Sequence, residues 1–307
     1  MTMGVPITER TFIGKVFLSP NENRLRAGWR LALQTALMLF IGISVDLGLA
    51  FVPFFGLRDP NSLARSIFVE TVMITLSVFL ASRWLDRRPF ASLGLVVTRR
   101  MVSDVLVGIL ITLILMGLMF LWEYALGWLT IDRGTWQVVP PGTLAIGLAT
   151  DLVSFIFIGW NEELLSRGYH LHTLASGLNL FWGVIVSSFM FAILHLGNPN
   201  AGNVWMVTLG IAAAGFFLAY AFLRTGQLWL SIGLHIGWNF FEGPIFSFPV
   251  SGTTSFQLLQ TTVKGPPLWT GGAFGPEAGL IVFPVLALGI MLIYWLTRGR
   301  QAVKKIE

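Results

Sequence analysis

The stretch GWNEELLSRGYHLH (Gly159–His172) overlaps the end of an apolar run, LAIGLATDLVSFIFIGW (Leu144–Trp160), and continues beyond it. A segment of about 20 mostly apolar residues can cross the hydrocarbon core of a bilayer as a helix. Ionisable side chains at such a place are energetically costly and indicate a function. Two adjacent glutamates, an arginine and two histidines therefore predict a polar site that is carried by a helix within the membrane.

The composition of the whole chain is that of a membrane protein. Of its 307 residues, 55% are hydrophobic and 11% are charged, with a mean hydropathy of +0.75, whereas soluble domains carry about 25% charged residues. The net charge of +5 comes from basic residues that flank apolar runs, so we expect no nucleic-acid partner. The absence of cysteine excludes disulfides, thiolate metal ligands and a cysteine nucleophile.

We expect an all-α fold, a polytopic transmembrane helical bundle of about eight spanning helices that enclose an intramembrane polar cavity. The expected spans are residues 31–54, 66–82, 104–130, 144–165, 179–196, 205–223, 228–248 and 278–297. The transmembrane domain is expected at 31–298, between an N-terminal cytoplasmic segment at 1–30 and a basic cytoplasmic tail at 299–307. The first 28 residues lack the apolar core of a signal peptide, so the first span is expected to direct insertion.

Basic residues cluster beside three of these spans and predict the topology. They precede the first span (Arg24, Arg26, Arg30), follow the second (Arg83, Arg87, Arg88, Arg99, Arg100) and follow the last (Arg298, Arg300, Lys304, Lys305). By the positive-inside rule all three clusters lie in the cytoplasm, together with both termini. We expect an integral, multi-pass protein in contact with membrane lipid, in a bacterial or archaeal cell membrane.

Several ionisable residues in the apolar spans stand alone in the sequence, namely Asp46, Glu70, Glu123 and Asp151. We expect these four to be structural, as helix-end or interhelical hydrogen-bonding groups. His170 and His172, two residues apart, fall on different helix faces and are expected to be interfacial or solvated.

Polar residues recur at helical spacing in three other places. The motifs are E-E-x-x-x-R (Glu162, Glu163, Arg167), F-x-x-x-H (Phe191, His195) and H-x-x-x-N (His235, Asn239). Residues four apart share a helix face, so Glu163 can pair with Arg167. Glu162 is turned away from that face by about 100° and is left unpaired. An unpaired carboxylate in an apolar cavity can exchange a proton, as a general base must.

The chain distances predict that these motifs meet. If the helix that carries Glu162 continues to about Ser176 and the chain returns from Leu180, Glu162 and His195 each lie roughly 16 residues, or about 24 Å, from the turn. They would then sit at similar depth on neighbouring antiparallel helices. A third helix could add His235 and Asn239 to the same point.

At these residues the chain resembles the CPBP family of intramembrane endopeptidases, which includes CAAX prenyl proteases of the Rce1 type and bacterial Abi proteins. That family is marked by E-E-x-x-x-R, F-x-x-x-H and H-x-x-x-N/D in this order on successive helices, and this sequence contains all three motifs. The resemblance covers roughly residues 140–245. It implies a helical bundle around a water-containing cavity in the membrane.

The resemblance also implies an activity: hydrolysis of a peptide bond in a membrane-associated protein or peptide, without a metal or another cofactor. Eukaryotic CAAX-type relatives act on prenylated proteins. By carry-over, Glu162 and His195 would activate water, and His235 and Asn239 would stabilise the oxyanion of the tetrahedral intermediate. Glu163 and Arg167 would hold the first helix in place.

Three alternatives remain open from the residues. Glu162, His195 and His235 could instead ligate zinc and leave a position for water, although the zincin motif H-E-x-x-H is absent. The same groups could carry protons in a proton-coupled transporter. In a non-catalytic immunity or scaffold protein, they would only join helices.

Overall fold

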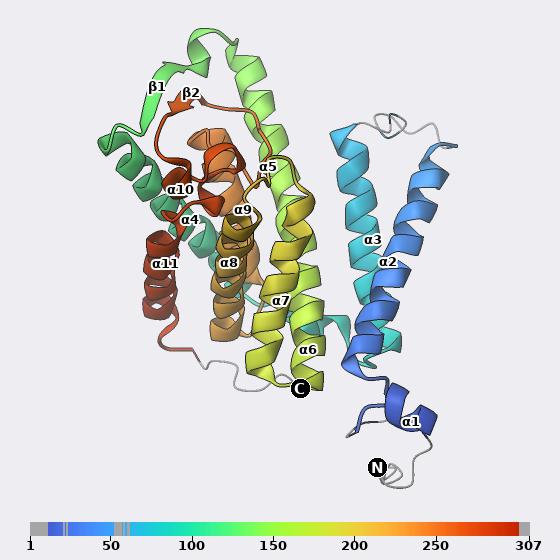
Figure 1. Ribbon diagram of the computed structural model, residues 1–307. Coiled ribbons are helices and arrows are strands. Elements are labelled where there is room, and N and C mark those ends of the chain that lie inside the picture. The colour runs from blue at the N-terminus through green and yellow to red at the C-terminus, as the bar shows by residue number, and fades with distance from the viewer. Residues whose placement is uncertain are drawn as a thin grey trace.

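The computed structural model describes residues 12–20, 22, 24–51, 57, 59 and 62–300. Its α-helices are α1 (Phe12–Phe17), α2 (Ala27–Leu49), α3 (Leu63–Trp84), α4 (Arg100–Ala125), α5 (Pro141–Glu163), α6 (His172–Gly177), α7 (Leu180–Leu194), α8 (Val204–Thr225), α9 (Trp229–Phe240), α10 (Pro267–Thr270) and α11 (Val282–Thr297). The structure also contains two π-helices (Leu164–Leu171, Phe241–Ile245) and five 3₁₀ turns (Phe90–Leu93, Thr135–Gln137, His195–Gly197, Gly272–Phe274, Pro276–Ala278). Two antiparallel strands, β1 (Leu129–Gly134) and β2 (Leu259–Val263), pair with each other. The long helices run up and down, with α2 and α3 as a pair beside the others (Figure 1), and together they form the predicted helical bundle.

Six helical stretches of the described residues are long and apolar enough to cross a membrane: Ala27–Leu49, Leu63–Trp84, Arg100–Ala125, Pro141–Gly177, Leu180–Gly197 and Val204–Thr225. They overlap the first six predicted spans, and the chain is an integral, multi-pass membrane protein. The fourth stretch extends beyond the predicted end at residue 165 to Gly177, and residues 52–54 of the first predicted span lie outside the described residues. The last two predicted spans coincide with α9 and its π-helical extension and with α11, which has 16 residues. A total of eight spans therefore stays a prediction. Residues 1–11 and 301–307, in the two predicted terminal segments, lie outside the described residues.

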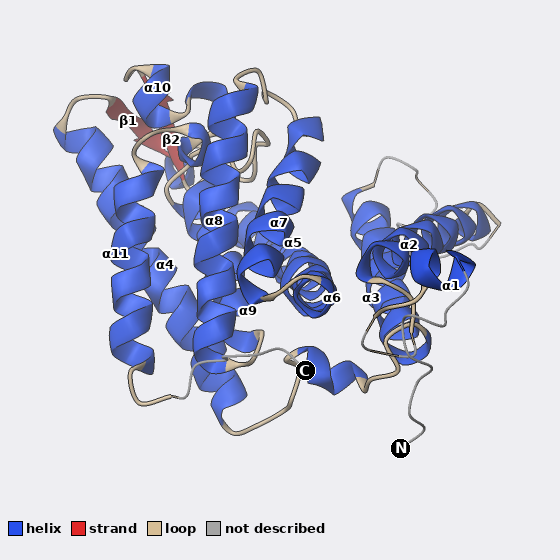
Figure 2. Ribbon diagram, turned by 60° about the horizontal axis from the view of Figure 1, so that its bottom comes forward, coloured by secondary structure: helices blue, strands red, loops and turns tan. Residues whose placement is uncertain are grey.

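The helix that carries the E-E-x-x-x-R motif is the longest apolar stretch. It runs without a break through α5, the π-helix and α6 over 37 residues. The chain then reverses, and the side chain of Asn179 accepts a hydrogen bond from the backbone N–H of Trp182 to cap α7. The turn predicted between Ser176 and Leu180 is thus present, and α7 returns beside α5 and α6 (Figure 2).

Helix α9 lies in the middle of the bundle because glycines let its backbone approach α4. A Cβ atom on Gly108 of α4 would come within 2.5 Å of the backbone nitrogen of Leu234, and one on Gly233 of α9 within 2.3 Å of the carbonyl oxygen of Val105. Small residues permit such contacts between helices in membranes. Every residue of α9 from Leu230 to Asn239 is buried, so its polar residues face the interior of the helical bundle.

Helices α2 and α3 pack on each other and lie to one side of the other helices (Figure 2). Hydrogen bonds connect α3 to α5, from Asn161 Nδ2 to Thr71 Oγ1 (3.1 Å) and from Trp160 Nε1 to Thr75 Oγ1 (3.0 Å). These bonds hold α5 in register with α3 at the two residues directly before Glu162.

Candidate active site

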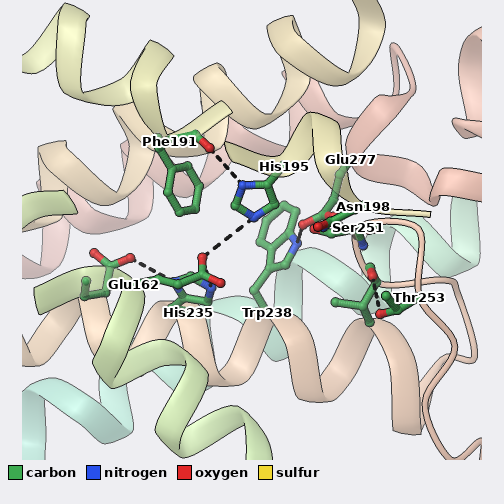
Figure 3. A network of polar contacts seen from close by, with 12 residues as sticks. Glu162, Phe191, His195, Asn198, His235, Trp238, Ser251, Thr253 and Glu277 are labelled. Carbon is green, nitrogen blue, oxygen red and sulfur yellow. Dashed lines mark hydrogen bonds and ion pairs between the residues drawn. The ribbon is translucent and has the colours of Figure 1, made fainter. Parts of the chain in front are cut away.

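Three helices bring Glu162, His195 and His235 to one point, as the chain distances predict (Figure 3). Nε2 of His195, at the end of α7, and Nε2 of His235, in α9, each lie 3.7 Å from Oε2 of Glu162 in α5. Within the described part of the chain, this oxygen accepts no hydrogen bond. The carboxylate therefore faces two imidazoles and retains a free lone pair.

A second hydrogen bond orients each imidazole. Nδ1 of His195 donates to the carbonyl oxygen of Phe191 (2.8 Å), and Nδ1 of His235 donates to Oε1 of Glu163 (2.8 Å). Both acceptors lack protons, so in the neutral imidazoles the hydrogen resides on Nδ1 and the Nε2 lone pair points at Glu162. Nε2 of either histidine can then take up a proton from a group placed between it and Glu162.

The ion pair expected between Glu163 and Arg167 is present and fully enclosed. Arg167 Nη1 donates to Glu163 Oε1 (2.8 Å), Nη2 donates to the carbonyl oxygen of Gly215 in α8 (3.2 Å), and the guanidinium carbon lies 4.4 Å from the centre of the Phe191 ring. The ring of Phe191 in turn lies 4.5 Å from that of His195. Arg167 and Phe191 thus form one packed unit that supports both α5 and His195.

A cavity of about 190 Å³ adjoins these side chains. The four predicted catalytic residues, Glu162, His195, His235 and Asn239, all line it, and most of its remaining wall is apolar. The side chain of Glu162 is 25% exposed, against 8% for His235. A cavity of this kind, apolar with a few convergent polar groups, is typical of a site that binds and orients a small part of a substrate.

The cavity has a second polar wall that the sequence did not predict. Glu277, in the 3₁₀ turn before α11, accepts hydrogen bonds from Trp238 Nε1 (3.0 Å) and from the backbone N–H (2.8 Å) and hydroxyl (2.6 Å) of Ser251. Asn198 Nδ2 donates to the carbonyl oxygen of Ser251 (3.0 Å). Glu277 stands in a loop-like stretch, GPEAG, outside any helical motif, so no periodic signal could have indicated it.

Glu277 connects α9 to the turn at Ser251. Burial raises the pKa of this carboxyl, while the hydrogen bonds from Ser251 and the electrostatic effects of His195 and His235 lower it. With three donors directed at its two oxygens, the carboxylate is satisfied by the protein itself. It therefore holds the cavity wall in shape.

Replacement of Glu277 by leucine is expected to lower the free energy of unfolding by about 2–4 kcal/mol, because the buried N–H groups of Trp238 and Ser251 lose their acceptor. Thermal unfolding of the purified protein in detergent measures this change. Asp132→Leu is the control, since Asp132 is an exposed carboxylate on β1 that accepts a hydrogen bond from Thr262. Equal losses in the two variants would contradict the role given to Glu277.

Two of the isolated ionisable residues have the structural partners expected for them. Asp46 Oδ1 accepts a hydrogen bond from Arg65 Nε (2.8 Å), and Asp151 Oδ2 accepts one from the backbone N–H of Phe256 (2.7 Å). Glu123 is fully buried, and its oxygens have no hydrogen-bond partner in the described part of the chain. Glu70 is less isolated than the sequence indicated, because its carboxylate lies near enough to Glu162 for the two to repel each other.

The prediction that His170 and His172 are interfacial or solvated is wrong. They are 5% and 6% exposed, and His172 Nδ1 lies 3.2 Å from the carbonyl oxygen of Arg167. The prediction rested on the two histidines falling on different faces of the helix. In the structure α2, α3, α7 and α8 surround the π-helix and α6, so both histidines are enclosed.

The described residues contain no group of three or more His, Cys, Asp or Glu side chains placed to hold a metal ion. Glu162, His195 and His235 approach one another, but each Nε2 lies 3.7 Å from the carboxylate oxygen, and no fourth ligand of these types joins them from the part of the chain that the structure describes. The hypothesis of a zinc site is therefore supported by the types of these three residues and not by their geometry.

Comparison with known proteins bears on the same part of the chain. Residues 143–241 match the family model of the type II CAAX prenyl endopeptidase Rce1-like proteins. This segment is similar to that family. The matched segment contains every residue of the three motifs, so the resemblance predicted from them is confirmed. Ser251 and Glu277, on the second wall of the cavity, lie outside it.

The chain is also 32% identical over 131 residues to an uncharacterized protein, YyaK, of Bacillus subtilis (strain 168). This alignment covers 41% of the present chain and 42% of that relative. The aligned part is thus less than half of either protein, and the relative's name does not state an activity.

Proposed function

We propose that this protein is an intramembrane endopeptidase that hydrolyses a peptide bond of a membrane-associated protein or peptide. One observation carries the proposal: three helices of a membrane bundle place a free carboxylate oxygen, two oriented imidazoles and an amide around one cavity. The match of this segment to Rce1-like endopeptidases supports it. CAAX-type processing of prenylated proteins is the nearest family activity.

In this mechanism Glu162 and His195 activate water. A water molecule between Glu162 Oε2 and His195 Nε2 can donate a hydrogen bond to each, because both atoms are acceptors. As its oxygen attacks the scissile carbonyl carbon, one proton passes to Glu162 or His195. The C–N bond then breaks, and that proton moves to the leaving amine, which yields a carboxylic acid and an amine.

The developing oxyanion needs donors from the other side of the cavity. Asn239 Nδ2 carries hydrogens in every state, whereas His235 can donate from Nε2 only as the imidazolium, since its Nδ1–H is directed at Glu163. The carboxylate of Glu163 favours that charged form. Glu163 would then stabilise the oxyanion indirectly, through His235, besides pairing with Arg167.

The proposal is tested with the purified protein and a set of quenched-fluorescent peptides that includes prenylated CAAX peptides. We expect new peptide termini, with one atom of ¹⁸O from labelled water in each new carboxylate. Cleavage that persists unchanged in Glu162→Gln would overturn the mechanism. Glu162-dependent uptake or proton flux without new termini would favour a transporter, and complex formation that survives Glu162→Gln would favour a scaffold.

A chelator distinguishes glutamate chemistry from zinc chemistry in the same assay. We propose the metal-independent mechanism, so cleavage is expected to continue after prolonged treatment with a strong zinc chelator. Loss of cleavage with the chelator, and recovery on addition of zinc alone, would instead assign Glu162, His195 and His235 as ligands.

A further inference from the structure

Two ion-pair clusters mark the opposite ends of the paired helices α2 and α3. At one end, Arg30 near the start of α2 pairs with Asp86, just after α3, and its Nη2 donates to Ser176 Oγ in α6 (2.8 Å). At the other end, Arg65 at the start of α3 pairs with Asp46 near the end of α2 (2.8 Å). We call these the Arg30 end and the Arg65 end of the bundle.

The active-site cavity lies far from the Arg30 end. Glu162 precedes Ser176 on one continuous helical stretch, and the separation of these residues corresponds to a rise of about 20 Å. His195 ends a helix that begins at Leu180, next to the same turn, which again gives about 22 Å. Since the hydrocarbon core is about 30 Å thick, the catalytic groups lie in the half of the membrane nearer the Arg65 end.

The segments that close the cavity belong to the Arg65 end as well. Val250, Ser251, Thr253 and Glu277 line the cavity and come from the connections on either side of β2 and α10. In Figure 1, β1, β2 and α10 lie at the end of the bundle opposite the turn between α6 and α7. The polar wall of the active site is therefore continuous with the loops of the Arg65 end.

Positive charge is concentrated at the Arg30 end. The described basic residues at or beside helix ends there are Lys15, Arg24, Arg26, Arg30, Arg83, Arg87, Arg88, Arg99, Arg100, Arg224, Arg298 and Arg300. Arg300 Nη2 pairs with Asp104 Oδ1 (2.6 Å), which places the end of α11 beside the start of α4 at this same end. At the Arg65 end the described basic residues are Arg65, Arg133 and Lys264, and Arg65 is paired with Asp46.

Because basic residues beside spans stay in the cytoplasm, we propose that the active site lies in the non-cytoplasmic half of the membrane and receives its substrate from that side. The substrate class is then a membrane-protein segment at the non-cytoplasmic surface, and a cytoplasmic protein tail could not reach the cavity. The substrate part of this inference rests on the proposed function, whereas the orientation does not.

The natural lack of cysteine permits a direct test of orientation on the full chain. Val138 and Val97 are a matched pair of valines, 51% and 76% exposed, just before α5 and between α3 and α4. Val138→Cys is expected to react with a membrane-impermeant maleimide in intact bacterial cells as fully as after permeabilisation. Val97→Cys is expected to react only after permeabilisation.

The reverse pattern, or labelling of both cysteines in intact cells, would overturn the orientation. The thiol content after denaturation shows that each cysteine is present. If a position proves unreactive even in permeabilised cells, Gln137→Cys and Ala91→Cys, which are exposed at the same two ends, replace the pair.

A second arm tests the direction of substrate access. Intact cells carrying the wild-type protein are expected to cleave an impermeant fluorogenic peptide that the purified protein cleaves in detergent, and cells carrying Glu162→Gln are not. Cleavage only after permeabilisation would overturn access from the non-cytoplasmic side. If no peptide is cleaved even in detergent, the proposed function fails, and with it the substrate class, while the labelling result still decides the orientation.

Discussion

Replacement of Glu162 by glutamine is expected to lower kcat by about 10³-fold or more, because general base catalysis contributes about 10²–10⁴-fold and the amide cannot take up a proton. Glutamine has almost the same shape as glutamate, and Glu162 Oε2 accepts no hydrogen bond from the described residues. The substitution therefore removes the base with little loss of packing. KM is expected to change much less than kcat, since the carboxylate acts in the transition state.

Kinetics on a peptide that the wild-type protein cleaves measure this effect. Glu123→Gln is the control, because Glu123 is a carboxylate within a membrane helix whose oxygens, like Oε2 of Glu162, have no hydrogen-bond partner among the described residues, but it lies in α4 and does not line the cavity. We expect the control to retain activity within a few-fold of the wild type. A fall in kcat of similar size in both variants would show that Glu162→Gln lowers activity by destabilising the fold and not by removing the base.

Replacement of Arg167 by methionine is expected to have the largest effect on stability, a loss of about 3–5 kcal/mol in the free energy of unfolding, because it leaves a buried charge uncompensated. Arg167 is 2% exposed and Glu163 is fully buried. Methionine retains an unbranched side chain over the Phe191 ring, so the charge is the main change. The carbonyl oxygen of Gly215 also loses its donor.

Thermal unfolding of the purified protein in detergent measures this loss, and a double-mutant cycle assigns its cause. The variant with both Arg167→Met and Glu163→Gln is expected to recover a large part of the lost stability, because the uncompensated charge is then gone. If the loss of stability in the double variant equals the sum of the losses in the two single variants, the loss in Arg167→Met does not come from an unpaired Glu163 carboxylate. Glu163→Gln should also lower activity, since His235 loses the charge that favours its imidazolium form.

Much of the fold and of the first wall of the site could be predicted because the signals are local. The apolar run that ends at Trp160 predicts a membrane helix, and the spacing of four from Glu163 to Arg167 predicts their ion pair. The equal distances of Glu162 and His195 from one short turn predict that they meet. Each of these inferences needs only the rise and the period of a helix.

Other features depend on contacts between distant segments and could not be predicted in this way. Glu277 is a single glutamate in a loop, and its role arises only because Trp238 and Ser251 meet it. His170 and His172 are buried because neighbouring helices enclose them, which their spacing cannot reveal. The tautomer of His235 likewise follows from Glu163, an acceptor on another helix.

The sequence by itself thus determined that this protein is a bundle of membrane helices and which helix faces carry the carboxylate, the imidazoles and the amide. These properties depend on hydrophobicity and helical period, which are encoded over a few neighbouring residues. Only the tertiary structure decided that Glu162 faces both imidazoles and that Glu277 and Ser251 close the cavity. These properties depend on packing between segments far apart in the chain, and the local sequence does not specify it.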